Sequence, residues 1–335
     1  MKKIFSVIGK ILLYFIIVAL LLFLSVRLVD GIAFAKFYAN SSPVFATPGV
    51  SNGYVPQGFD YDEANGVFLA TGYMKNGEAS RVYIIDEDGN ARFVNLQKEN
   101  GEDYTGHTGG ISHNGEYIYI TGSNGIDVFS YSALLDGATE ISLLGSVSTF
   151  NDPAYCYIQN NYLYTGSFYF PESYETPDHE RLVSPAGDEN TGLMTVFALD
   201  ENAPFGINPA PKAVISTTMA VQGMCFTDEG EIVLSTSYGL SASKLLVYDT
   251  SAITQEICDF TGTTKDGDEF SFQSIPLYYL DSACLVQTIK APPMSEELVY
   301  LDGKIYVMNE SACNKYIFGK LTTGLRVRAY EYKKD

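Results

Sequence analysis

The sequence predicts an all-β protein, a five-bladed β-propeller of four-stranded blades that follows one N-terminal transmembrane helix. Its 25 Tyr and 20 Phe accompany many Val and Ile, residues that favour strands. Helix-period patterns end within the first 40 residues. One unit of short strands recurs five times at intervals of roughly 45 to 75 residues, a period typical of propeller blades. Six blades, or a pair of sandwiches, is the alternative architecture.

The N-terminal segment contains an unbroken apolar run, Ile11–Val26, which its neighbours extend to the ~20 residues that a bilayer requires. Lys2, Lys3 and Lys10 precede this run, so the positive-inside rule predicts a cytoplasmic N-terminus. We therefore expect a cytoplasmic segment over 1–10, a signal-anchor helix over 11–29, a spacer over 30–41 and an extracellular domain over 42–335. A signal peptide cleaved near Ala35 is the alternative, although that site lies far beyond the apolar run.

Charge is distributed unevenly along the chain. After residue 30 the sequence contains 17 basic and 39 acidic residues, a formal net charge of −22. Such a field repels phosphate backbones, which argues against nucleic acid as a partner. It suits a soluble domain outside a cell.

The clearest copy of the repeat is Val221–Asp249, and the other four copies align with it. First strands are expected at Gln57–Tyr61, Gly109–His113, Ala154–Ile158, Gln222–Phe226 and Glu296–Tyr300. Turns of Asp, Asn and Gly separate them from second and third strands, as in a β-meander. The last copy lacks a fourth strand, and the segment Ser42–Gly49 is predicted to supply it and so to close the ring.

Strand direction brings the starts of the first strands together at one mouth of the propeller axis, with the ends of the second strands around them. The residues expected to bind a ligand at this mouth are Gln57, Tyr73, Gln222 and Tyr238. The alternative is that Gln57 and Gln222 only satisfy backbone groups along the channel.

Four further residues at the same mouth are candidates for catalysis: His107, Glu296, Glu310 and Asp152. His107 could act as a general base or as a metal ligand with these carboxylates as partners. No cofactor motif is evident, since P-loop, G-x-G-x-x-G, H-E-x-x-H and G-x-S-x-G patterns are all lacking in the sequence. A divalent cation is the one cofactor that the residues suggest. The alternative is a solvated loop histidine.

Two long insertions interrupt the repeats. Tyr169–Asn190 lengthens a connection at the mouth and would suit a lid. Thr250–Ala283 is expected on the opposite face, where it could contact a partner. The five cysteines are odd in number, and a bridge between Cys258 and Cys284 is one option.

Val55–Asp86, VPQGFDYDEANGVFLATGYMKNGEASRVYIID, resembles the opening repeat of the glutamine cyclotransferase family, secreted propellers that cyclise N-terminal glutamine. The Gln-Gly strand starts, Gln57-Gly58 and Gln222-Gly223, are similar to those of secreted bacterial propellers. The later repeats depart from the cyclotransferase family, because the chain has no Trp and reads GGI, AYC and EEL where the family has E-G-L or E-G-W. The resemblance therefore implies the fold more than the activity.

Three functions follow from these observations. The first is a membrane-anchored extracellular module that binds a small molecule, a glycan or an envelope protein at the mouth. The alternative is a propeller enzyme, a cyclotransferase-like acyl transferase or a metal-assisted hydrolase, that uses His107 with the carboxylates. The third is a scaffold within an envelope complex.

Overall fold

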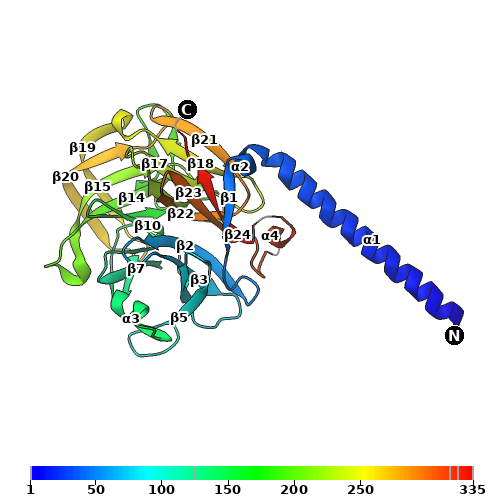
Figure 1. The fold of residues 1–335 in the computed structure, drawn as a ribbon. Coiled ribbons are helices and arrows are strands. Elements are labelled where there is room, and N and C mark those ends of the chain that lie inside the picture. Colours follow the sequence, from blue (N-terminus) through cyan, green and yellow to red (C-terminus); the bar gives the residue numbers. More distant parts are fainter. Residues whose placement is uncertain (1, 124, 317, 323, 334–335) are drawn as a thin grey trace.

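A long helix projects from a body of β-sheets in the computed structural model (Figure 1), which describes residues 2–123, 125–316, 318–322 and 324–333. Met1 of the predicted cytoplasmic segment and residues 334–335 of the predicted domain lie outside the described residues. The helix α1 spans Lys2–Ala33, and its part Val7–Ala33 is long and apolar enough to cross a membrane. At ~1.5 Å per residue this part is about 40 Å long, more than the ~30 Å of a hydrocarbon core.

The strands of the body form antiparallel meanders that follow the predicted repeat. The first repeat contains β2 (Tyr54–Asp62), β3 (Val67–Met74), β4 (Arg81–Asp86) and β5 (Ala91–Gln97). The second contains β6 (Ile111–His113), β7 (Tyr117–Gly122), β8 (Gly125–Ser130) and β9 (Glu140–Val147). The third contains β10 (Pro153–Gln159), β11 (Tyr162–Ser167), β14 (Gly192–Leu199) and β15 (Ile207–Thr217). The fourth contains β16 (Val221–Phe226), β17 (Ile232–Thr236), β18 (Ser243–Tyr248) and β21 (Leu285–Ala291), and the last contains β22 (Ser295–Leu301), β23 (Lys304–Asn309) and β24 (Arg326–Glu331).

The N-terminal strand β1 (Ser41–Ala46) joins the sheet of the last repeat, which has the strand order β1-β24-β23-β22. It pairs antiparallel with β24, and Ser41 lies opposite Tyr330. The predicted pairing of the N-terminal segment with the last copy is therefore confirmed, and the two ends of the domain meet in one sheet.

The first strands of the repeats surround a common axis. Each first strand contacts the next in the order β2, β6, β10, β16 and β22, and β22 in turn contacts β2. Sheets arranged in this way around an axis form a β-propeller. The outer strands β5 and β9 also pair, in parallel, which joins the first two repeats into one sheet of eight strands.

Glycines allow the inner strands to approach one another closely. A Cβ atom on Gly58 would lie 2.6 Å from the backbone nitrogen of Ile111, and one on Gly223 would lie 2.3 Å from Cα of Glu297. Both distances are too short for a carbon atom, so these positions require glycine. This packing explains the Gly of the two Gln-Gly strand starts.

The junction between α1 and the body is packed. Residues 30–41 were expected to be a spacer, but they include the helix α2 (Ala35–Ala39) and bury Phe37, whose ring stacks on Tyr330 with 5.4 Å between the ring centroids. Nη1 of Arg27 in α1 donates a hydrogen bond to the carbonyl oxygen of Thr322 at 2.7 Å.

The second insertion forms a hairpin of β19 (Thr254–Thr263) and β20 (Glu269–Tyr279), which extends the sheet of the third repeat because β20 pairs with β15 in parallel. Lys265 at its tip forms an ion pair with Asp152 at the mouth, with 2.7 Å between Nζ and Oδ2. The prediction that this insertion lies on the opposite face is therefore wrong for its tip, because pairing with a neighbouring sheet carries the hairpin toward the mouth.

The remaining elements are short, and they are α3 (Tyr131–Leu135), α4 (Phe318–Leu321), β12 (Leu182–Val183), β13 (Glu189–Asn190) and the 3-10 helices η1 (Asp178–Glu180), η2 (Pro204–Gly206) and η3 (Thr250–Ala252). β12, β13 and η1 belong to the first insertion. All five cysteines are free, so the bridge between Cys258 and Cys284 is not formed.

Candidate functional site

A cavity of about 550 Å³ lies at the mouth of the propeller axis. Seven of the eight candidate residues line it, and they are Gln57, Tyr73, His107, Asp152, Gln222, Tyr238 and Glu310. The eighth, Glu296, is buried and is not among the lining residues. Side chains from all the repeats therefore converge here, as the strand directions predict.

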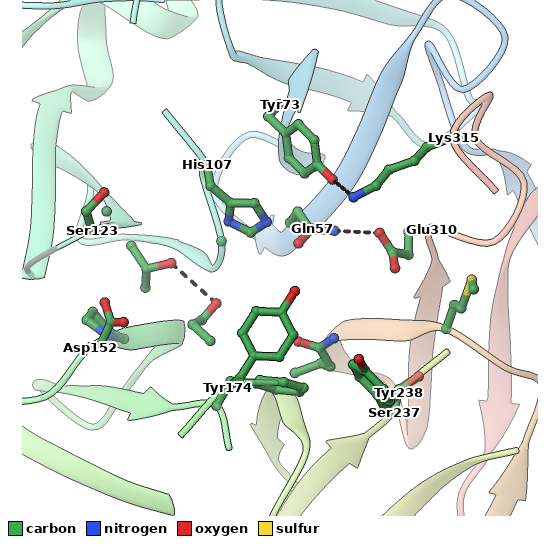
Figure 2. A pocket seen from close by; sticks show the side chains of 18 of the residues that line it. Gln57, Tyr73, His107, Ser123, Asp152, Tyr174, Ser237, Tyr238, Glu310 and Lys315 are labelled. Carbon is green, nitrogen blue, oxygen red and sulfur yellow. Dashed lines mark hydrogen bonds between the residues drawn. The ribbon is translucent and has the colours of Figure 1, made fainter. Parts of the chain in front are cut away.

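One wall of the cavity is polar (Figure 2). Nε2 of Gln57 donates a hydrogen bond to Oε2 of Glu310 at 3.0 Å and another to the carbonyl oxygen of Pro56 at 2.7 Å. Beside them, Nζ of Lys315 donates to the hydroxyl of Tyr73 at 2.5 Å. Gln57 thus satisfies a backbone group and also orients a cavity carboxylate, while its role in ligand binding stays a prediction.

Lys315 and its neighbour Tyr316 line the cavity and were not anticipated from the sequence. They follow the second strand of the last repeat in a connection without a recognisable motif. The only signal was their position after Glu310, at the end of a strand that points to the mouth. Lys315 and Tyr316 reach the cavity only because this connection folds back toward the mouth of the axis.

The last repeat contains two buried carboxyl groups, Glu296 in β22 and Glu310 directly after β23. Burial raises the pKa of Glu310 to about 7, although Lys315 and the hydrogen bonds from Gln57 and Tyr316 oppose the rise. Burial and the neighbouring Glu310 raise the pKa of Glu296 further above its ordinary value, and its Oε1 has no hydrogen-bond partner in the described part of the chain. Burial therefore favours the protonated form of both carboxyl groups.

His107 packs against an aromatic ring, with 4.8 Å between its ring centroid and that of Tyr73. Burial and the charge of Lys315 lower its pKa, so the imidazole is neutral at pH 7. Within the described residues, His107 makes no hydrogen bond to Glu296, Glu310 or Asp152. Its role as a base with these carboxylates stays a prediction.

The other wall is aromatic. Tyr238 stacks on Phe170 with 3.6 Å between the ring centroids, and Phe168 and Tyr174 lie 6.3 Å from Tyr238 by the same measure. Tyr174 and Tyr238 keep 56% and 36% of their surface exposed, and both line the cavity (Figure 2). Because Phe170 and Tyr174 belong to Tyr169–Asn190, the first insertion forms part of the cavity wall.

Among the described residues, no group of three His, Cys, Asp or Glu side chains is arranged to hold a metal ion. The divalent cation therefore stays a prediction from the sequence.

Glu297 holds the inner strands together beneath the cavity. Its Oε2 accepts the backbone N–H of Phe59 at 2.8 Å and that of Ile111 at 2.9 Å, and its Oε1 accepts that of Cys156 at 3.1 Å. The side chain is fully buried. Sequence reasoning passed over this residue, because its role depends on three strands from other repeats.

No protein-family model matches the chain, and a search of curated proteins found no match. Solved structures similar to it include an exo-β-1,3-galactanase from Phanerochaete chrysosporium with galactose (12% identity over 88% of this chain and 64% of that one, TM-score 0.45). Others are a PQQ-bound aldose sugar dehydrogenase from Streptomyces coelicolor (13%, 81% and 79%, TM-score 0.39) and BamB from Moraxella catarrhalis (9%, 84% and 84%, TM-score 0.33). All three TM-scores lie below 0.5, so the proposals below rest on the residues of this chain.

Proposed function

We propose that this protein is a membrane-anchored binding module whose cavity at the propeller mouth takes a neutral, polyhydroxylated ligand such as a glycan. The observation that carries the proposal is the pairing of an aromatic wall with a polar wall across one cavity. The C–H face of a sugar ring packs on an aromatic face, which carries partial negative charge. Its hydroxyl groups can then exchange hydrogen bonds with Gln57, Glu310 and Asp152.

The propeller in this proposal has five blades. The support is the set of four four-stranded meanders and one three-stranded meander, whose inner strands contact one another in the order β2, β6, β10, β16 and β22. β1 completes the fifth blade by its pairing with β24. A closed ring leaves few strand edges exposed, which suits a domain outside the cell.

The domain is proposed to lie outside the cell and to be held by α1 as an uncleaved signal-anchor. Three lysines at the N-terminus support a cytoplasmic start. The packing of Phe37 on Tyr330 and the bond from Arg27 to Thr322 support a fixed attachment to the helix. Cleavage near Ala35 would remove α1 together with the bond from Arg27.

Binding can be tested with the full chain in detergent micelles and a panel of neutral mono- and oligosaccharides, read by thermal shift and then by calorimetry. A bound ligand raises the melting temperature of the domain. We expect Tyr238→Ala to weaken binding at least ~10-fold, since it removes the stacking surface. Leu240→Ala, on an exposed residue outside the cavity, is the control. Failure of every sugar to bind at ~10 mM, or unchanged affinity in Tyr238→Ala, would overturn the proposal.

A second candidate is a propeller enzyme that uses Glu310 for proton transfer. A pKa of about 7 favours this residue, because a general acid or base works best when its pKa is near the ambient pH. Incubation with oligosaccharides and with a peptide that begins with glutamine, followed by mass spectrometry, would reveal hydrolysis or cyclisation. Glu310→Gln should abolish any such product, while Asp103→Asn, at an exposed residue that does not line the cavity, should not.

A further inference from the structure

A second cavity of about 510 Å³ lies beneath the first insertion. It shares four lining residues with the central cavity, and they are Asp152, Phe168, Tyr174 and Lys265. The two spaces are therefore neighbours that meet along these side chains. Since liquid water occupies ~30 Å³ per molecule, the side chamber has room for a ligand and not only for ordered water.

Two buried residues that line the side chamber carry unpaired acceptor atoms. Glu180 is fully buried, and its Oε2 accepts a hydrogen bond from Ser167. Its Oε1 has no hydrogen-bond partner among the described residues. Asn151, 8% exposed, donates from Nδ2 to the carbonyl oxygens of Thr165 and Leu193, both at 3.0 Å, while its Oδ1 has no such partner.

Unpaired acceptors in a buried position cost about 1–3 kcal/mol each, so most buried polar atoms in proteins have partners. Glu180 and Asn151 therefore contribute polar groups to the wall of the chamber. Nε2 of His179, behind the chamber wall, lies 3.9 Å from Oε1 of Glu180 and has no hydrogen-bond partner among the described residues.

Glu180 at the chamber wall and the neighbouring His179 form an uncharged pair at neutral pH. Burial raises the pKa of Glu180 to about 8, and burial lowers the pKa of His179. Both side chains are therefore neutral at pH 7 and can exchange hydrogen bonds without attracting an ion. Hydroxyl groups, which both donate and accept, suit these partners better than a cation or an anion does.

We propose that the two chambers are adjacent subsites of one binding site for an oligosaccharide, with the side chamber taking the second and further sugar units. This inference rests on the glycan-binding function proposed above and extends it to chain length. Phe168 and Tyr174 provide aromatic surface to both subsites. The ion pair of Asp152 with Lys265 lies at their shared boundary, where its polar atoms can contact the link between two sugar units.

The test is calorimetry on the full chain in detergent micelles, with mono- to pentasaccharides of the cello-, malto-, xylo- and chito-series. We expect the trisaccharide of the bound series to bind at least ~10-fold more tightly than its monosaccharide. Ser173→Trp should remove this gain and leave monosaccharide affinity unchanged, because Ser173 is exposed and lines only the side chamber. Thr263→Trp fills the same chamber from the hairpin and serves as a second variant.

Ser173→Ala controls for loss of the serine hydroxyl. Ser142→Trp controls for the effect of a tryptophan at an exposed position outside both chambers. Affinity that does not depend on chain length, or a gain that survives in both blocked variants, would overturn the two-subsite inference while binding itself persists. No binding of any sugar by the unmodified chain would instead overturn the proposed function, and the inference with it.

Discussion

Nε2 of Gln57 donates a hydrogen bond to Oε2 of Glu310 at 3.0 Å, although 253 positions separate the two residues in the chain. The bond joins the first repeat to the last, which is its neighbour around the axis. It also orients the one cavity carboxylate whose pKa lies near neutrality. The same contact therefore joins two repeats and positions a carboxylate that lines the cavity.

Gln57→Leu should raise the pKa of Glu310 above about 7, since the lost hydrogen bond favours the ionised carboxylate. A rise of roughly one unit corresponds to ~1.4 kcal/mol. The measurement is an NMR titration of the Glu310 carboxyl carbon. Gln222→Leu is the matched control, because Gln222 lines the same cavity without a described bond to Glu310. An unchanged pKa in Gln57→Leu would contradict this role.

Glu297→Ala should destabilise the domain by at least ~3 kcal/mol, because three buried N–H groups lose their acceptor at about 1–3 kcal/mol each. Hydrogen exchange at Phe59, Ile111 and Cys156 should accelerate together. Glu297→Gln keeps one acceptor oxygen and should lose less stability. Equal stability of Glu297→Ala and the unmodified chain would show that water replaces the carboxylate.

Glu180→Gln should change how stability depends on pH. Since folding raises the pKa of Glu180 from 4.5 to about 8, the folded state binds the proton more tightly. The unmodified domain therefore loses stability as pH rises from about 4.5 to 8, and the Gln variant lacks this loss. The difference in free energy of unfolding, variant minus unmodified, should grow across that window by about 4 kcal/mol.

Denaturant unfolding at several pH values measures this difference, with Glu172→Gln on the same insertion as an exposed control. A difference that stays constant from pH 4.5 to 8 would show that Glu180 ionises as readily in the folded domain as in the unfolded chain.

Phe37→Ala should destabilise the domain by about 3–4 kcal/mol, the usual cost of removing a buried phenylalanine ring. A chain that starts at Ser42 should lose a similar amount, since it lacks the same ring. Thermal unfolding measures both, with Leu240→Ala as an exposed control. If the truncated chain matched the full chain in stability, residues 30–41 would act as the spacer expected from the sequence.

The sequence by itself determined the strands, because period-2 alternation and Gly, Asn and Asp turns are local signals. The copies aligned on Val221–Asp249 correspond to observed strands, and β1 pairs where the missing fourth strand predicts. The mouth residues followed from strand direction, which is why Gln57, His107 and Gln222 line one cavity.

Only the tertiary structure decided which other side chains reach that cavity. Lys315 and Lys265 lie in connections whose paths depend on neighbouring sheets, so their spacing in the chain carried no signal. The sequence pointed to Glu296 and not to its neighbour Glu297, yet Glu297 accepts hydrogen bonds from three inner strands, while Glu296 lies buried beside Glu310. The pattern of residues within each repeat specifies its strands. Which side chains lie at the cavity depends instead on contacts between repeats that are distant in sequence, and these contacts form only when the ring closes.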